Sequence, residues 1–246
     1  MPYFNAIFFD IGSTLIPSAK ISASAAAHAC EQLAHDGLIP NAPAFLSCYQ
    51  QADALINPPH ISHIYSDARI ICKAEELARL PADTRRVACF LHSYRDAMRT
   101  QIQPSYKMLE LFAKLERAGV QRGIISDGSV EGQGEVLFRL GLLSSISPDL
   151  CLISEAVGVT KSDPEIYRRA LALARVEPSR ALMIGDRLDL DVAAPQSLGM
   201  KAALLRAHTP PAFISQNIST SANEARPDYV LDTWEELQAW LLGFCV

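Results

Sequence analysis

The fold of this chain is decided by the stretch Ala6-Ile7-Phe8-Phe9-Asp10-Ile11-Gly12-Ser13-Thr14-Leu15. Its apolar first half is typical of a short strand buried on both faces, and the Gly-Ser-Thr sequence after Asp10 predicts a turn. In open α/β sheets, ligands bind just outside the carboxyl ends of such strands, which is where Asp10 stands. A carboxylate there must be solvated, paired or bound to a cation, because burying it alone is very costly. The plainer interpretation is an aspartate that caps a turn, and later segments of the chain argue against it.

The composition is that of a globular protein. The chain has 246 residues, is 49% hydrophobic and 20% charged, and is long enough for one large domain or a domain with an insertion. Its net charge of -5 offers no broad basic surface, so we expect neither nucleic acid nor an anionic membrane as a partner. No apolar run approaches the length of a membrane span, and we expect no signal peptide at the N-terminus. The six cysteines lack CxxC spacing, which favours reduced thiols in the cytoplasm over a zinc site.

The region after the first strand is rich in helix-forming residues. We expect helices at 21–36, 43–56, 64–80 and 81–101, the last with Pro81 at its first position. A helical region of this length between two strands is too long for a simple crossover. We therefore predict an inserted α-helical cap at residues 17–102, over a core formed by residues 1–16 and 103–246.

The rest of the chain alternates between helical and strand-like segments. Strands are expected at 121–126, 150–153, 181–184, 201–205 and 229–231, and helices at 106–118, 135–140, 163–174, 192–198 and 234–242, with a long loop at 208–228. Strands that alternate with helices indicate a parallel sheet with helices on both faces. The predicted fold class is therefore α/β, with a Rossmann-like core.

Chemically capable side chains follow the predicted strands. Asp10, Ser126, Lys161, Asp186 and Asp191 would be brought to one edge of the sheet. Carboxylate oxygens suit Mg²⁺, which proteins commonly hold with one or two carboxylates and a substrate phosphate. The lysine would neutralise phosphate charge, the hydroxyl would donate to its oxygens, and an aspartate could attack phosphorus. Taken singly, Lys161 is more often a surface lysine and Ser126 a turn residue, but such residues at four strand ends favour a site.

Four motifs in this order resemble those of the haloacid dehalogenase superfamily of hydrolases. The first is an apolar strand followed by Asp-x-Asp-x-Thr, and the second is a strand ending in Ser or Thr. The third is Gly-x-x-Lys-Pro-Asp-Pro, and the fourth is Gly-Asp-x-x-x-x-Asp. The matching segments are Asp10-Ile11-Gly12-Ser13-Thr14, Gly123-Ile124-Ile125-Ser126-Asp127-Gly128, Gly158-Val159-Thr160-Lys161-Ser162-Asp163-Pro164 and Gly185-Asp186-Arg187-Leu188-Asp189-Leu190-Asp191.

The resemblance implies a role for each matched residue. Asp10 would be the nucleophile, with Ser126 and Lys161 as the other catalytic residues. The metal site would hold Mg²⁺ through Asp10, Asp186, Asp191 and the backbone carbonyl of Gly12. The residues expected to bind substrate are Thr14, Ser126, Asp127, Gly128 and Lys161. The implied function is a magnesium-dependent phosphatase that acts on a small phosphorylated metabolite through an aspartyl-phosphate.

Gly12 departs from the family's first motif. In the family's phosphatases an aspartate at this position protonates the leaving oxygen and then activates water, and glycine can do neither. Loss of general acid–base catalysis typically costs about 100- to 10,000-fold in rate. Ser13, Asp127 or the histidines His60 and His63 are candidates for a substitute, and the sequence does not choose among them.

The departure leaves alternative functions open. Phosphonate hydrolases of the family carry a small residue at the position of Gly12 but need a lysine in the cap, and neither Lys20 nor Lys73 stands in a recognisable context for one. Haloacid dehalogenases carry a bulky residue there and use no magnesium. A non-catalytic binding protein with the same fold is the remaining alternative, although the intact Asp10, Lys161 and Asp186 argue against it.

Overall fold

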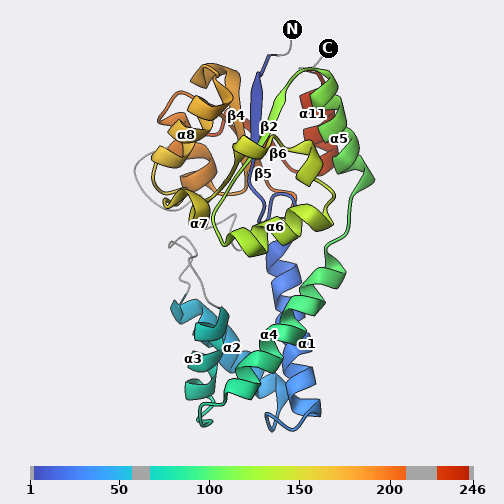
Figure 1. The fold of residues 1–246 in the computed structure, drawn as a ribbon, viewed down its shortest axis with the longest axis vertical. Helices are drawn as coiled ribbons and strands as arrows, with labels where there is room; N and C mark the ends of the chain where they lie inside the picture. The colour runs from blue at the N-terminus through green and yellow to red at the C-terminus, as the bar shows by residue number, and fades with distance from the viewer. Residues whose placement is uncertain (1–2, 57–66, 209–225, 244–246) are drawn as a thin grey trace. The chain divides into compact units, whose positions relative to one another are not determined.

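The computed structural model describes residues 3–56, 67–208 and 226–243. The chain forms two compact units (Figure 1), one made of Met1–Ser18 and Pro104–Val246 and the other of Ala19–Gln103. We call the first the α/β unit and the second the helical unit. The start of the predicted helix at 64–80 lies outside the described ranges. Most of the predicted loop at 208–228 also lies outside them.

The α/β unit is built on a six-stranded sheet in the order β3-β2-β1-β4-β5-β6. Every neighbouring pair of strands is parallel, as the alternation of strands and helices predicted. The strands are β1 (Ala6–Phe9), β2 (Gln121–Ser126), β3 (Cys151–Ile153), β4 (Ala181–Gly185), β5 (Lys201–Leu205) and β6 (Tyr229–Leu231). The first strand of the chain is thus central, with β2 on one side and β4 on the other.

Helices cover both faces of this sheet, and Figure 1 shows α8 on one side and α5 with α11 on the other. The helices and short turns of the unit are α5 (Tyr106–Arg117), α6 (Val130–Arg139), η1 (Leu143–Ser145), η2 (Pro148–Leu150), α7 (Ser154–Val157), α8 (Glu165–Ala174), η3 (Pro178–Arg180), η4 (Leu188–Ala193), α9 (Ala194–Gln196) and α11 (Trp234–Gly243). Phe8 packs in the core beneath α8, and the ring of Phe9 lies 4.9 Å from that of Phe112 on α5. Successive β1 side chains therefore point to opposite covered faces, which explains the unbroken apolar run.

A close approach between β1 and β2 requires glycine. Gly123 pairs with Phe8 in the sheet, and a Cβ added to Gly123 would lie 2.6 Å from the nearest carbon of the Phe8 ring. The smallest residue therefore allows the large ring to lie over the neighbouring strand.

The helical unit consists of α1 (Ser18–His35), α2 (Ala42–Ile56), α3 (Asp67–Leu77) and α4 (Thr84–Gln101). The α1 helix begins one residue before the unit boundary. The helices pack around a core that includes Leu33, Phe45, Ile71 and Phe90. One buried ion pair crosses this unit, from Arg86 to Glu75 at 2.6 Å.

Several predicted helix limits were wrong. The first helix begins at Ser18 and not at residue 21. The fourth helix begins at Thr84 and not at Pro81, because the side chain of Asp83 accepts a hydrogen bond from Arg85 N and caps the helix. The helix predicted at 135–140 begins at Val130, where Ser129 caps it through Gly132 N. The helix predicted at 192–198 is a π-helical turn at Leu188–Ala193 followed by the short α9.

Candidate active site

The carboxyl ends of the three central strands bring three of the predicted residues together. Asp10 follows β1, Ser126 ends β2 and Asp186 follows β4. The carboxylate of Asp10 is buried, and the Ser126 hydroxyl donates to its Oδ1 at 3.2 Å. Asp10 N also donates to Ile184 O at 2.9 Å, which fixes the backbone at this carboxylate.

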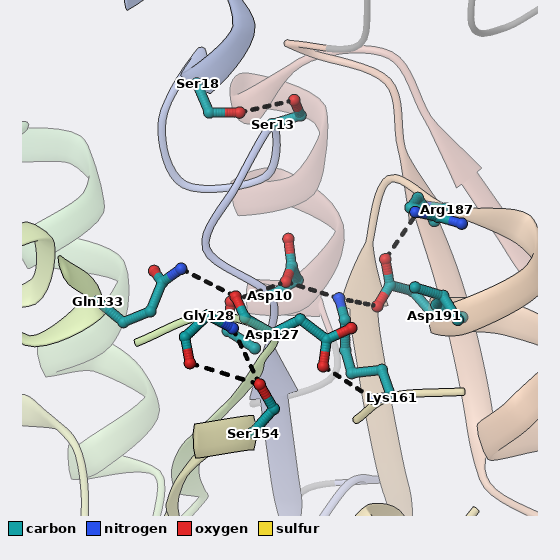
Figure 2. Close-up of polar contacts among 12 residues, drawn as sticks. Asp10, Ser13, Ser18, Asp127, Gly128, Gln133, Ser154, Lys161, Arg187 and Asp191 are labelled. Carbon is teal, nitrogen blue, oxygen red and sulfur yellow. Dashed lines mark hydrogen bonds and ion pairs between the residues drawn. The ribbon is translucent and has the colours of Figure 1, made fainter. Parts of the chain in front are cut away.

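Lys161 reaches the same carboxylate from the loop before α8. Its ammonium group is buried and lies 2.7 Å from Asp10 Oδ1 and 2.8 Å from Asp191 Oδ1. Figure 2 shows Lys161 and Asp191 together on one side of Asp10. Burial disfavours the charged amine, but the negative charges of Asp10 and Asp191 outweigh it, so the pKa of Lys161 rises well above its usual range. The lysine is therefore a fixed positive charge at neutral pH.

The two oxygens of Asp10 differ in their surroundings. Oδ1 accepts from both Ser126 and Lys161, whereas no described residue donates a hydrogen bond to Oδ2. Among the described residues, the buried side-chain atoms without a hydrogen-bond partner are Thr14 Oγ1 and Asp127 Oδ2, so Asp10 Oδ2 is not one of them. One oxygen is thus held in place by two donors, and the other accepts a hydrogen bond from no described residue.

Asp10, Asp186 and Asp191 form a group that could hold a metal ion. One carboxylate oxygen from each lies within 4.8 Å of the others. Burial, together with the charges of Asp10 and Asp191, raises the pKa of Asp186 to about 8. Burial also raises the pKa of Asp191, and the charge of Asp10 adds to this while Lys161 opposes it. The positive charges of Lys161 and Arg187 only partly offset the repulsion among the three acids, and a divalent cation would relieve it.

The backbone around this acidic group is shaped to bring Asp191 inward. Arg187 N donates to Asp191 Oδ2 at 3.0 Å, and a Cβ on Gly185 would collide with the Asp191 carboxyl group. Position 185 therefore requires glycine for steric reasons, because only the absence of a Cβ lets the fully buried Asp191 carboxylate lie against the end of β4.

The backbone carbonyl of Gly12 is the fourth oxygen that the sequence predicted for the metal site. No described group donates a hydrogen bond to it. A Cβ at Gly12 would have only the Ser18 side chain near it, with Oγ at 3.5 Å, and this is ordinary contact. Ser18 Oγ lies 3.0 Å from Ser13 Oγ, and Ser13 has a positive φ of 56°. Carboxylate and carbonyl oxygens are both hard donors of the kind that Mg²⁺ takes.

The turn after β2 carries Asp127 and Gly128, both expected to bind substrate. In the structure, Asp127 Oδ1 accepts from Lys161 N at 2.9 Å, and Gly128 N donates to Ser154 Oγ at 3.0 Å. Figure 2 shows Ser154 beneath this turn. The side chain of Asp127 and the N–H of Gly128 therefore stabilise the loop in this state.

Thr14, also expected to bind substrate, is completely buried. Its carbonyl accepts from Trp234 Nε1 at 3.1 Å, and its hydroxyl has no partner among the described residues.

Two further residues at the site were not found from the sequence. Ser154 is the first, since it follows β3 without a motif to mark it. Tyr167 is the second: its hydroxyl donates to Leu190 O at 2.6 Å, next to Asp191. A hydroxyl-bearing residue at the carboxyl end of a strand, as for Ser126, is the signal that could have indicated Ser154, which directly follows β3.

Comparison with known proteins agrees with this geometry. The sequence profile of the family described as haloacid dehalogenase-like hydrolase matches residues 4–199. The chain belongs to this family. It is therefore a hydrolase with the family's α/β fold, as its motifs predicted.

Relatives of this haloacid dehalogenase-like hydrolase include proteins named glyceraldehyde 3-phosphate phosphatase. The one from Methanopyrus kandleri is 26% identical over 95% of this chain and 95% of its own length. The one from Pyrococcus furiosus is 27% identical over 82% of this chain and 80% of its own length. Among solved structures, the magnesium-bound HAD-hydrolase YfnB from Bacillus subtilis has a TM-score of 0.65 and 20% identity, covering 97% of this chain and 98% of that one. This last likeness concerns the fold. None of the helices in the described residues is both long and apolar enough to cross a membrane.

Proposed function

We propose that this hydrolase is a magnesium-dependent phosphatase of a small phosphorylated metabolite, acting through an aspartyl-phosphate on Asp10. The observation that carries the proposal is the asymmetry of the Asp10 carboxylate: Ser126 and Lys161 hold one oxygen, and no described residue donates to the other. The phosphatase names of relatives that match most of the chain support a phosphate ester as the substrate.

In the first step, Asp10 Oδ2 attacks phosphorus, the bond from phosphorus to the ester oxygen breaks, and the leaving group departs with that electron pair. Lys161 and Ser126 already bind the carboxylate from one side. They are placed to bind the phosphoryl oxygens as the Asp10 charge is transferred into the new bond. In the second step, water attacks phosphorus, and breakage of the bond to Asp10 regenerates the carboxylate and releases inorganic phosphate.

Asp10, Asp186, Asp191 and the carbonyl of Gly12 would hold the magnesium ion. When bound, Mg²⁺ neutralises the charge that these acids and the phosphate bring together. The acids alone repel one another, as the raised pKa of Asp186 indicates. The chain's own contribution is to hold the carboxylates close together before the ion arrives.

Gly12 sets a limit on this chemistry. The proton that the leaving oxygen needs cannot come from a side chain at position 12. General acid–base catalysis typically contributes about 100- to 10,000-fold, or roughly 3–5 kcal/mol of barrier. We therefore expect the enzyme to favour substrates whose leaving group is stable as an anion or carries its own proton donor.

The proposal is tested by measuring phosphate release from a panel of phosphorylated metabolites and one aryl phosphate, with magnesium and with a chelator. The Asp10→Asn variant is the matched control, because the amide keeps the shape of the side chain but is a poor nucleophile. Release that requires magnesium and is lost in Asp10→Asn supports the proposal. Silence on every phosphate ester, with magnesium still bound, would contradict it and direct the search to phosphonates and halo acids.

A further inference from the structure

A buried hydroxyl in the α/β unit contacts the turn that carries Asp191. Tyr167 lies on α8, is fully buried, and donates its hydroxyl to Leu190 O at 2.6 Å. Burial, with the nearby charge of Asp191, raises the pKa of Tyr167 well above its usual range, so the hydroxyl stays protonated and remains a donor. A buried tyrosine hydroxyl must have a partner, but it need not be this carbonyl.

The accepting carbonyl has a specific need for a donor. Leu190 lies within the π-helical turn Leu188–Ala193. In a π-helix the carbonyl of one residue accepts from the N–H five residues later, and five residues after Leu190 is Pro195. Proline has no N–H. The Tyr167 hydroxyl therefore supplies a donor where the π-helical pattern cannot.

The segment from Lys161 to Tyr167 contacts two successive residues of the π-helical turn. Lys161, six positions before Tyr167, contacts the Asp191 carboxylate directly, while Tyr167 contacts the carbonyl of the residue before it. Tyr167 thus holds the peptide unit between Leu190 and Asp191, and Lys161 holds the Asp191 carboxylate.

We propose that Tyr167 is a positioning residue of the metal site, and that its hydroxyl sets the orientation of Asp191 for Mg²⁺. This rests on the metal site of the proposed function. A phenylalanine would fill the same space without holding the Leu190 carbonyl. Partners that orient metal ligands typically change metal affinity by about 10- to 100-fold when they are removed. We expect Tyr167→Phe to weaken Mg²⁺ binding by at least the lower of these factors.

The experiment is a calorimetric titration of the metal-free protein with MgCl₂, in the wild type and in Tyr167→Phe. Tyr94→Phe, in the helical unit, is the matched control. It also removes a tyrosine hydroxyl from a largely buried ring, but far from Tyr167 in the sequence. The melting temperature of each protein in chelator reports whether the variant is folded. The proposal predicts weaker Mg²⁺ binding in Tyr167→Phe and unchanged binding in Tyr94→Phe.

A second variant tests the reason given for the effect. Pro195→Ala returns an N–H to position 195, so the double variant Tyr167→Phe with Pro195→Ala should recover part of the lost affinity. Equal Mg²⁺ affinity in Tyr167→Phe and the wild type would overturn this inference and leave the proposed metal site standing. Absence of Mg²⁺ binding in the wild type itself would overturn both.

Discussion

Placing a carboxylate at position 12 should raise phosphatase activity. A Cβ on Gly12 would have its nearest non-neighbouring atom, Ser18 Oγ, at 3.5 Å, so the Cβ of Gly12→Asp meets only ordinary contact. The backbone of Gly12 is also outside the positive-φ region that only glycine adopts readily. Because the new group would supply general acid–base catalysis, we expect kcat/KM on an alkyl phosphate to rise by about 100- to 10,000-fold, or roughly 3–5 kcal/mol.

The size of the gain should depend on the leaving group. An alkyl phosphate such as glycerol phosphate releases a strongly basic oxygen that needs a proton, whereas para-nitrophenyl phosphate releases a stable phenolate. The gain in Gly12→Asp should therefore be large for the first substrate and small for the second. Phosphate release with magnesium, measured at several substrate concentrations, gives kcat/KM for both.

Two control variants separate proton transfer from simple filling of space. Gly12→Asn has nearly the same shape as Gly12→Asp but no carboxyl group, and Gly12→Ala adds only the Cβ. Both should stay near the wild-type rate. If Gly12→Asn gains as much as Gly12→Asp, or if the gain is equal for the two leaving groups, then the reasoning about the missing acid is refuted.

Three further perturbations test other parts of the structure. The pKa of Asp186 rises from its ordinary 3.8 to about 8 on folding, so the metal-free protein should lose stability as the pH rises through that interval. Over the same interval, the increase in melting temperature caused by Mg²⁺ should grow. An increase in melting temperature that is independent of pH would contradict this. Asp186→Asn should abolish both trends. Gly185→Ala should force Asp191 aside, which should lower the free energy of unfolding by about 1–3 kcal/mol and weaken Mg²⁺ binding in calorimetry. Unchanged stability together with unchanged Mg²⁺ affinity would be inconsistent with the close approach of Gly185 and Asp191. In the helical unit, Arg86→Ala should cost about 3–5 kcal/mol in chemical denaturation because it leaves a buried carboxylate unpaired, whereas Arg85→Ala, at an exposed ion pair, should change little; similar effects of the two would argue against the buried pair.

The chain's central architecture could be predicted because local pattern and topology agree. The apolar run before Asp10 required a strand covered on both faces, and parallel strands place their carboxyl ends at one edge. This shared edge alone brings Asp10, Ser126 and Asp186 together. The contact of Lys161 with two carboxylates follows less directly, because a lysine in a loop can point in many directions.

Other features depend on information that the sequence pattern does not carry. The helix from Val130 was predicted to begin too late because Gly132 and Gly134 lower helix propensity, and the cap at Ser129 outweighs them. The contact between Tyr167 and Leu190 joins residues 23 positions apart and depends on how α8 packs against the sheet. No periodicity in the sequence indicates the π-helical turn, whose geometry becomes visible only in three dimensions.

The most direct test of the central claim is to look for the phosphorylated enzyme. Wild-type protein would be mixed with magnesium and the best phosphate ester from the panel, quenched in acid during turnover, digested and examined by mass spectrometry. The account predicts a phosphoryl group on the peptide that contains Asp10, and on no peptide of the Asp10→Asn variant. Phosphate release at an undiminished rate in Asp10→Asn, with no phosphorylated peptide in the wild type, would contradict the role of Asp10 as the nucleophile.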